Sequence, residues 1–224
     1  RFDKICVSFR SEHQDKIFGT TRQQVLFDVS FNVKKGICLG ILGESGSGKS
    51  TIGRVMCGLL KPDSGSVLLE GNSVYESKQG KRELQSKLSI VFQDYTTSAN
   101  PRFSVSDIIK EGLYVRQRRE GYEIDQEAEI NMLLQLVGLS GSLADRFPHQ
   151  LSGGQLQRVC IARAVACKPQ IIVFDEAISS LDTHTQVQIM DLLIELKKKL
   201  DTQEIPTRKV AKNTTAATRV YARI

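Results

Sequence analysis

The chain has 224 residues, of which 40% are hydrophobic and 25% charged, enough apolar side chains for one sizeable core and a small appended subdomain. Its formal net charge is +6, but five basic residues and no acidic ones lie between Ile205 and Ile224. The charge excess is therefore concentrated at one end, and it does not predict a nucleic-acid-binding surface. No apolar run approaches the ~20 residues that a membrane span requires.

The five cysteines are odd in number and show no CxxC spacing, which argues against a metal site or a disulfide framework. Most of them lie within apolar or helical patterns, so we expect free thiols packed in the core, in a reducing compartment. The sequence opens with no secretory signal and begins at Arg1, not at methionine, so we expect it to be a fragment.

Two strands are predicted near the beginning of the chain. Phe2 to Phe9 is typical of an edge strand, and Val25 to Val33 alternates well enough for a second strand. Lys34 to Gly36 then turns into a third apolar segment, Ile37 to Leu42, which we expect to be a buried parallel strand.

The next segment, Gly43 to Ser50, reads GESGSGKS and fits the phosphate-binding pattern GxxxxGK[ST]. An apolar segment precedes it, and apolar residues at helical spacing follow it. A glycine-rich turn with a stray lysine is the alternative, but the order of strand, loop and helix favours a nucleoside triphosphate site. The apolar residues of the predicted helix are Ile52, Val55, Met56, Leu59 and Leu60.

Each residue type in this loop has a chemical reason to be there. Gly43, Gly46 and Gly48 allow backbone conformations that a Cβ atom would forbid, and so bring N–H groups onto phosphate oxygens. The helix N-terminus adds its partial positive charge. We expect Lys49 to reach the β- and γ-phosphates and the Ser50 hydroxyl to ligate Mg²⁺.

The chain continues with a turn at Lys61 to Gly65 and a short strand at Ser66 to Glu70. Asn72 to Lys87 is polar and predicts a surface segment with a short helix. Leu88 to Phe92 is a further strand, which ends at Gln93.

From Asp94 to Gln150 the pattern becomes helical. Asn100-Pro101 breaks the chain, and Val105 to Val115 and Glu127 to Val137 predict two helices. We interpret this region as an all-helical insertion between two α/β parts.

A second glycine motif, LSGGQ, occupies Leu151 to Gln155 and precedes a helix predicted from Leu156 to Cys167. Two glycines expose N–H groups at the helix start, and Ser152 adds a hydroxyl donor, so the motif predicts a second anion-binding turn. The simplest arrangement of two such turns is a head-to-tail dimer. In it, Ser152 and Gly154 of one subunit cover the γ-phosphate held by Lys49 of the other.

An apolar strand, Ile171 to Phe174, ends in the two carboxylates of Asp175 and Glu176. In a chain with a phosphate-binding loop, Asp175 is placed to hold Mg²⁺ beside Ser50, and Glu176 to orient and deprotonate the attacking water. Without that loop, two solvated acids would be the simpler interpretation. Asp182 is a natural N-cap for the helix that we expect from Thr183 to Lys199.

Together these motifs resemble the nucleotide-binding subunits of ABC transporters, from about Phe2 to Leu200. In that family GESGSGKS is the P-loop, Gln93 the Q-loop glutamine, LSGGQ the signature, IIVFDE the second nucleotide motif and SSLD the D-loop. Three segments resemble the importer branch that serves peptides and nickel, and the last of them most resembles nickel-import subunits. They are VFQDYTTSANPR, PHQLSGGQLQRVCIARA and DEAISSLD.

The resemblance implies an α/β P-loop ATPase fold with an N-terminal antiparallel β subdomain and an inserted all-helical subdomain. The ATPase core would comprise residues 1–93 and 151–200, the helical subdomain residues 94–150, and an atypical, disordered basic tail residues 201–224. The implied activity is Mg²⁺-dependent ATP hydrolysis that powers import, at the cytoplasmic face of the cell membrane. The implied partners are two membrane-spanning permease subunits, a second ATP-binding subunit and, indirectly, a solute-binding protein, with no nucleic acid.

The resemblance also implies roles for single residues. Phe9 would stack on adenine, with Phe18 as an alternative because the following loop is long, and Gln93 would link permease docking to the γ-phosphate. The implied catalytic residues are Glu176, Gln93 and Lys49, and the implied Mg²⁺ ligands are Ser50, Gln93 and Asp175. The implied nucleotide-binding residues are Gly43, Glu44, Ser45, Gly46, Ser47, Gly48, Lys49, Ser50, Thr51, Phe9, Ser152, Gly153, Gly154 and Gln155.

The C-terminus departs from the family pattern. Members continue into an apolar strand that ends in a histidine contacting the γ-phosphate, and Asp201 to Ile224 contains neither. The abrupt change suggests a reading-frame change or a truncated gene product, and it leaves open a subunit that binds ATP but hydrolyses it poorly. Soluble ABC-type ATPases of DNA repair or translation are a weaker alternative, because the chain has no heptads between its motifs and only one cassette. The sequence does not determine the transported substrate.

Overall fold

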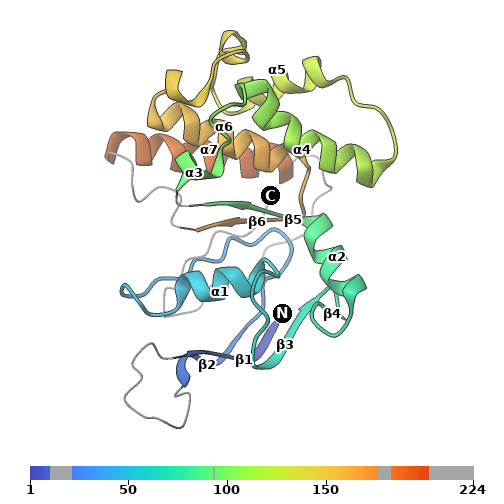
Figure 1. Cartoon of the computed structure of the whole chain (residues 1–224), viewed down its shortest axis with the longest axis vertical. Coiled ribbons are helices and arrows are strands. Elements are labelled where there is room, and N and C mark those ends of the chain that lie inside the picture. The colour runs from blue at the N-terminus through green and yellow to red at the C-terminus, as the bar shows by residue number, and fades with distance from the viewer. Residues whose placement is uncertain (11–21, 93, 176–182, 202–224) are drawn as a thin grey trace. The chain divides into compact units, whose positions relative to one another are not determined.

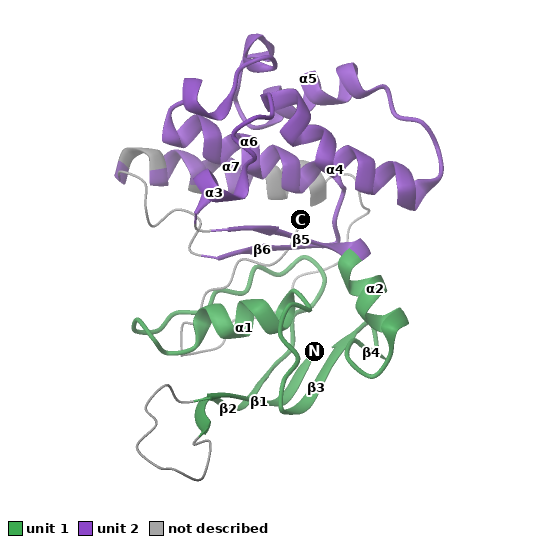
Figure 2. Cartoon of the chain, in the orientation of Figure 1, with its two compact units in different colours: residues 1–85, 217–220 green, residues 86–216, 221–224 purple. Residues whose placement is uncertain are grey.

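The computed structural model of the chain describes residues 1–10, 22–92, 94–175 and 183–201, which form two compact units. The first unit comprises Arg1–Gln85, and the second begins at Ser86 (Figures 1 and 2). None of the helices within these residues is both long and apolar enough to cross a membrane.

The first unit contains a four-stranded antiparallel sheet (Figure 1). The two strands predicted near the N-terminus are confirmed, but the first is not an edge strand, because β1 pairs with β2 on one side and β3 on the other. The strand β3, which follows the P-loop helix in the sequence, lies beside β1, with Val67 opposite Phe2. The hydrophobic pattern of β1 alone does not show that a second strand pairs with it. The order is β2-β1-β3-β4, with β1 at Phe2–Arg10, β2 at Arg22–Phe31, β3 at Ser64–Leu69 and β4 at Asn72–Ser73.

The predicted helix after the P-loop is confirmed as α1 (Lys49–Met56), but it is shorter than the apolar spacing suggests. Gly58 adopts a φ of +70°, and its N–H donates to the carbonyl of Val55 (3.2 Å) while that of Leu59 donates to the carbonyl of Arg54 (2.9 Å). This left-handed turn ends the helix. Leu59 is therefore 59% exposed and does not extend the buried face.

The apolar segment before the P-loop is not the buried parallel strand that its sequence predicts. Within residues 37–42 only Gly40 forms an isolated β-bridge, and Ile37 and Leu42 are 51% and 57% exposed. A buried parallel strand needs a paired neighbour along each edge. The four strands of the first unit pair with one another and not with this segment. The segment leads into the P-loop without a regular strand.

The cysteines of the chain are free thiols, as predicted. Cys38 differs from the prediction of core packing, because it lies in the irregular segment before the P-loop and is exposed, and Cys6 is half-buried. The buried thiols are those of Cys57, Cys160 and Cys167.

The polar segment predicted from Asn72 to Lys87 contains β4 and the short surface helix α2 (Lys78–Lys87). Only Gly80 and Leu84 of this helix are buried. A Cβ atom added at Gly80 would overlap the carbonyl oxygen of Ser73, so glycine is what allows the helix to pack so closely on β4.

The second unit contains a two-stranded parallel sheet and a layer of helices (Figure 2). Both predicted strands are confirmed, and they pair from Leu88 opposite Ile171 to Val91 opposite Phe174. The strands are β5 (Leu88–Val91) and β6 (Ile171–Phe174). The helices are α3 (Tyr95–Ser98), α4 (Val105–Glu120), α5 (Gln126–Leu136), α6 (Gly153–Ala166) and α7 (Thr183–Asp201), with 3-10 turns at Gly141–Leu143 and Pro148–Gln150.

Local signals set the ends of the long helices. Ser104 and Asp107 form a capping box at the start of α4, and Gly121, with a φ of +75°, ends it. The Asp125 carboxylate accepts the N–H of Ala128 (3.2 Å) and caps α5. The helices predicted from Val105 and from Glu127 are thus confirmed.

Helices α4 and α6 pack closely in the second unit. Gly112 lies at their contact, where an added Cβ would overlap the carbonyl oxygen of Arg163 and lie 2.8 Å from the Cβ of Ala166. Helices from the predicted insertion and the helix of the signature therefore share one core. The least exposed large residues of this core are Ile108, Ile109, Leu113, Leu134, Ile161, Ile172 and Ile189.

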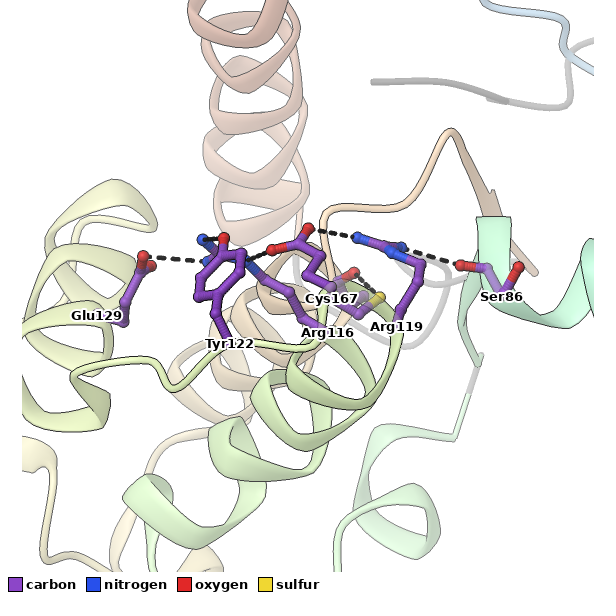
Figure 3. Close-up of polar contacts among 8 residues, drawn as sticks. Ser86, Arg116, Arg119, Tyr122, Glu129 and Cys167 are labelled. Carbon is purple, nitrogen blue, oxygen red and sulfur yellow. Dashed lines mark hydrogen bonds and ion pairs between the residues drawn. The ribbon is translucent and has the colours of Figure 1, made fainter.

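A buried arginine fixes the far end of α4 (Figure 3). The Arg116 side chain is 5% exposed, and its guanidinium donates to the carboxylates of Glu120 (3.0 Å) and Glu129 (3.0 Å) and to the Tyr122 hydroxyl (3.2 Å). The two acidic partners and the hydroxyl make the burial of this charge tolerable. They also connect α4 to α5.

Two further arginines bind carbonyl oxygens on either side of β5. Arg119 of α4 donates to the carbonyl of Ser86 (3.0 Å), just before the strand (Figure 3). Arg163 of α6 donates to the carbonyl of Ser98 (2.8 Å), after the strand, and to the Glu111 carboxylate of α4 (3.0 Å). The helices are thus attached to both ends of β5.

Candidate nucleotide-binding site

The P-loop is an exposed turn that leads directly into α1. Gly46 and Gly48 have φ values of +82° and +92°, a region that favours glycine. At Gly43 an added Cβ would lie 2.6 Å from Oγ of Ser47, and at Gly48 it would lie 2.7 Å from a methyl carbon of Leu26. The loop is therefore tightly folded on itself and lies against β2.

The side chain of Lys49 curls back over this loop. Its Nζ donates to the carbonyl oxygens of Gly43 (2.8 Å) and Glu44 (2.7 Å). No side chain caps α1 and its first turn carries no acidic residue, as far as the described residues go. An ammonium group and the positive end of a helix thus meet at one exposed turn, which suits a phosphate group.

The residues present fit a nucleoside triphosphate with Mg²⁺. Lys49 and the N–H groups of the loop would hold the β- and γ-phosphates. Ser50 and Thr51 begin α1 and are half-buried, and the Ser50 hydroxyl would coordinate the ion. The bound ion would neutralise charge on the phosphates; this chain's own part is to position them.

Phe9 lies near the end of β1, opposite Gln23 of β2. Val7, two residues earlier, is buried and lies opposite Leu26, the residue that a Cβ atom added at Gly48 would overlap. The Phe9 ring is 38% exposed, so an adenine could stack on it. That role stays a prediction, and the alternative, Phe18, lies outside the described residues.

The signature forms the N-terminus of α6 in the second unit. The Ser152 hydroxyl accepts the N–H of Gln155 (3.2 Å), and the Gln155 side chain accepts the N–H of Ser152 (2.9 Å), which makes a capping box. Gly153 and Gly154 then occupy the first turn at the positive end of the helix. The predicted helix began at Leu156, so the glycines of the motif belong to the helix itself, and the use of the Ser152 oxygen as its cap was not predicted.

Asp175 directly follows β6 and is half-buried. Its N–H donates to the carbonyl of Val91 (3.0 Å), which continues the pairing with β5 by one residue. Across from it, the segment after β5 leads into α3, where hydrogen bonds from Thr96 and Thr97 lower the pKa of the capping Asp94 carboxylate to about 2. Gln93, Glu176 and the D-loop residues up to Asp182 lie outside the described residues, so their roles stay predictions.

Asp175 thus lies at the carboxyl end of the parallel pair β5 and β6, which is the end where α/β proteins bind ligands.

A family model described as ABC transporter matches residues 26–179 of the chain. The chain belongs to the ABC transporter family. This confirms the resemblance that the P-loop, signature and acidic strand predicted.

Curated relatives support the importer branch of this ABC transporter family. The oligopeptide transport ATP-binding protein OppF of Bacillus subtilis is 42% identical over 84% of this chain and 62% of its own length. The metal-staphylopine import system ATP-binding protein CntF of Staphylococcus aureus is 42% identical over 85% of this chain and 73% of its own. The nickel import ATP-binding protein NikE of Brucella suis is 41% identical over 80% and 67%. These identities do not separate nickel from peptide relatives, and the chain spans less than two thirds of OppF.

Solved structures agree on the fold. A dimeric ABC cassette, MJ0796 bound to ADP and Pi in a post-hydrolysis state, has a TM-score of 0.73 and 28% identity, with 88% of this chain and 82% of that chain covered. CbiO1 from Clostridium perfringens, part of the transporter complex cbiONQ, has a TM-score of 0.68 and 29% identity, over 88% and 75%. The α/β P-loop ATPase fold is confirmed.

Three residues that the sequence patterns did not single out hold the elements around the site in place. The Tyr75 hydroxyl bonds the carbonyl oxygens of Val55 (2.6 Å) and Leu60 (2.8 Å) at the end of α1, and burial raises its pKa. Arg163 and Arg116 join separate helices. The sequence around a tyrosine in a polar segment, or around an arginine inside a helix, does not show which residue it will bind. These three residues are therefore identified only from the fold.

Proposed function

We propose that this chain is the ATP-hydrolysing subunit of an importer of oligopeptides or small metal complexes. The observation that carries the proposal is the P-loop geometry, in which the Lys49 ammonium lies over an exposed turn at the uncapped start of α1. The names of the relatives support the importer class, since they include oligopeptide, metal-staphylopine and nickel uptake.

The proposed reaction follows the roles that the family motifs imply. Lys49 and the loop N–H groups would hold the phosphates, and Ser50 and Asp175 would hold Mg²⁺. Glu176 orients a water molecule and takes its proton as the water attacks the γ-phosphorus, and ADP leaves. Gln93 contacts the γ-phosphate side of the site and reports its state to the partner subunits.

The proposed assembly is a head-to-tail pair of ATP-binding subunits on two membrane-spanning permeases, at the cytoplasmic face of the membrane. Gly153, Gly154 and the hydroxyl hydrogen of Ser152 supply donors to the γ-phosphate held by the opposite subunit. Ser152→Arg places a long cation at this contact. We expect it to prevent ATP-dependent dimerisation, measured by light scattering, while leaving the affinity of the single subunit for ATP nearly unchanged.

Nucleotide binding by the purified chain tests the core of the proposal. Mg-ATP should raise the midpoint of thermal unfolding, and ATP with EDTA should raise it less, because the ion is part of the ligand. Lys49→Ala should remove most of the shift, whereas Lys78→Ala, an exposed lysine on α2, should keep it. Equal shifts for the two variants would contradict the assignment of the P-loop.

The cargo is tested separately, in cells. Permease and solute-binding proteins that copurify with the tagged full-length subunit identify the transporter, and uptake of labelled peptide or labelled nickel then identifies the cargo. Uptake of neither class would contradict the importer branch without affecting the nucleotide assignment.

A further inference from the structure

The signature helix α6 contains a buried amide with no partner. Gln157 is 0% exposed, and neither its Nε2 nor its Oε1 has a hydrogen-bond partner in the part of the chain that the structure describes. A buried amide without partners is unfavourable, and most such groups in proteins are paired. An apolar side chain of the same length would be more stable in this position if packing were its only role.

The place of this amide in the fold indicates what it could bind. Cys160 lies three residues further along α6 and therefore on an adjoining part of the same face. Its Sγ lies 3.7 Å from Oγ of Ser98 and 3.9 Å from the carbonyl oxygen of Tyr95, both in α3. Gln157 is one turn closer to the signature than this contact with α3.

The helix α3 is short and firmly attached at its far end. It has only four residues, Tyr95–Ser98, and its carbonyl at Ser98 accepts a hydrogen bond from Arg163 (2.8 Å). Its near end follows β5, at the carboxyl end of the parallel pair where a ligand would bind. Because Arg163 holds Ser98, a change at the end of β5 would move the start of α3 at Tyr95 more than it would move Ser98.

We propose that Gln157 is a positioning residue of the nucleotide cycle. When nucleotide binds, its amide pairs with a backbone group at the start of α3, and this pairing fixes the signature helix in the orientation that the dimer requires. The inference rests on the proposed function, because it needs a nucleotide and a partner subunit. In the nucleotide-free chain the amide contributes nothing to stability.

Gln157→Met tests this directly, because methionine keeps the length and unbranched shape of the side chain and removes its donor and acceptor. Gln157→Leu serves as a second variant of similar size. Gln135→Met is the matched control, since Gln135 is an exposed glutamine on α5. Three quantities are measured for each: the unfolding midpoint without nucleotide, the affinity of the single chain for Mg-ATP, and the concentration at which Mg-ATP drives dimerisation.

We expect Gln157→Met to unfold at the same or a higher temperature than the parental chain without nucleotide, and to bind Mg-ATP with unchanged affinity. Loss of one hydrogen bond in the dimerisation-competent state should then raise the protein concentration needed for half-dimerisation about tenfold. A role in packing alone would not change this third quantity while leaving the first two intact. Gln135→Met should match the parental chain in all three.

Three results would overturn the inference, and the third would also overturn the proposed function. Dimerisation of Gln157→Met and Gln157→Leu at the parental concentration would show that the amide has no partner in the nucleotide-bound state. A clear fall in the nucleotide-free unfolding midpoint of both would show that it is already paired without nucleotide. Failure of the parental chain to respond to Mg-ATP at all would contradict the proposed function, and the inference would fall with it.

Discussion

The two anion-binding turns of this chain begin their helices in opposite ways. At the start of α1, Gly48 is left-handed, no side chain caps the helix, and the Lys49 ammonium is held over the loop by hydrogen bonds to its carbonyls. At the start of α6, Ser152 and Gln155 cap the helix reciprocally. No side chain caps the helix at the first turn, whereas the second turn satisfies part of its own donor set.

This difference indicates a division of labour. A turn with an ammonium group and a helix start that no side chain caps is suited to bind a nucleotide by itself, because its uncapped N–H groups gain acceptors when the phosphate arrives. A turn that is already capped, with no cation in its first turn, gains less from a lone phosphate. The signature is therefore suited to recognise a phosphate that another subunit already holds.

The largest expected effect is on ATP turnover, and it comes from a residue outside both turns. The role of the base that deprotonates water is assigned to Glu176, which lies outside both turns. Glu176→Gln should lower ATP turnover by about 10²–10⁴-fold while preserving ATP binding and ATP-driven dimerisation. The measurement is phosphate release by the assembled transporter, with Mg-ATP binding by the subunit as the control. Parental turnover in this variant would show that another residue supplies the base.

The next largest effect is on the affinity of the single chain for Mg-ATP, compared between a variant of each turn. Lys49→Ala should weaken Mg-ATP binding by about 10- to 100-fold, since a hydrogen-bonded charge on a phosphate is lost. Ser152→Ala should leave the same affinity unchanged, because the signature serves the opposite subunit. Equilibrium binding of a fluorescent ATP analogue at protein concentrations below dimerisation checks both. A matching loss in both variants would refute the division of labour.

Sequence information was sufficient where chemistry is local. The helix after the P-loop, the strand that ends at Asp175 and the helices predicted from Val105 and Glu127 follow from residues within a few positions of one another, and the structure contains all four elements. Sequence information was insufficient where a segment's structure depends on which distant segment pairs or packs with it. Ile37 to Leu42 is as apolar as a buried strand, yet no regular ladder forms along it, and β1 gained β3 as a second neighbour. The pairing of Arg163 with Glu111 and the unpaired amide of Gln157 likewise depend on how α6 packs.

The free energy of unfolding tests whether the P-loop conformation requires glycine at position 48. Gly48→Ala should lower the free energy of unfolding by about 1–3 kcal/mol, because alanine is strained at a φ of +92° and its Cβ would overlap Leu26. The matched control is Gly53→Ala in the same helix, where an added Cβ meets nothing within 4 Å. That control should be neutral or stabilising by up to about 1 kcal/mol, since alanine is favoured over glycine inside helices. Urea denaturation measures both, and equal destabilisation would mean that the loop conformation does not require Gly48.

The smallest effect concerns the cap of α6. Ser152→Ala removes the side-chain oxygen that accepts the Gln155 N–H, and it should lower the free energy of unfolding by about 1 kcal/mol, whereas Ser152→Gly should cost only a few tenths. The glycine variant keeps the helix start open to water but lacks the hydroxyl that the opposite subunit's phosphate would meet. Both variants should therefore dimerise less readily with ATP, although only the alanine variant is measurably less stable. If weaker dimerisation instead followed stability, with the glycine variant dimerising like the parental chain, Ser152 would act through its cap alone and the signature would recognise phosphate with its backbone.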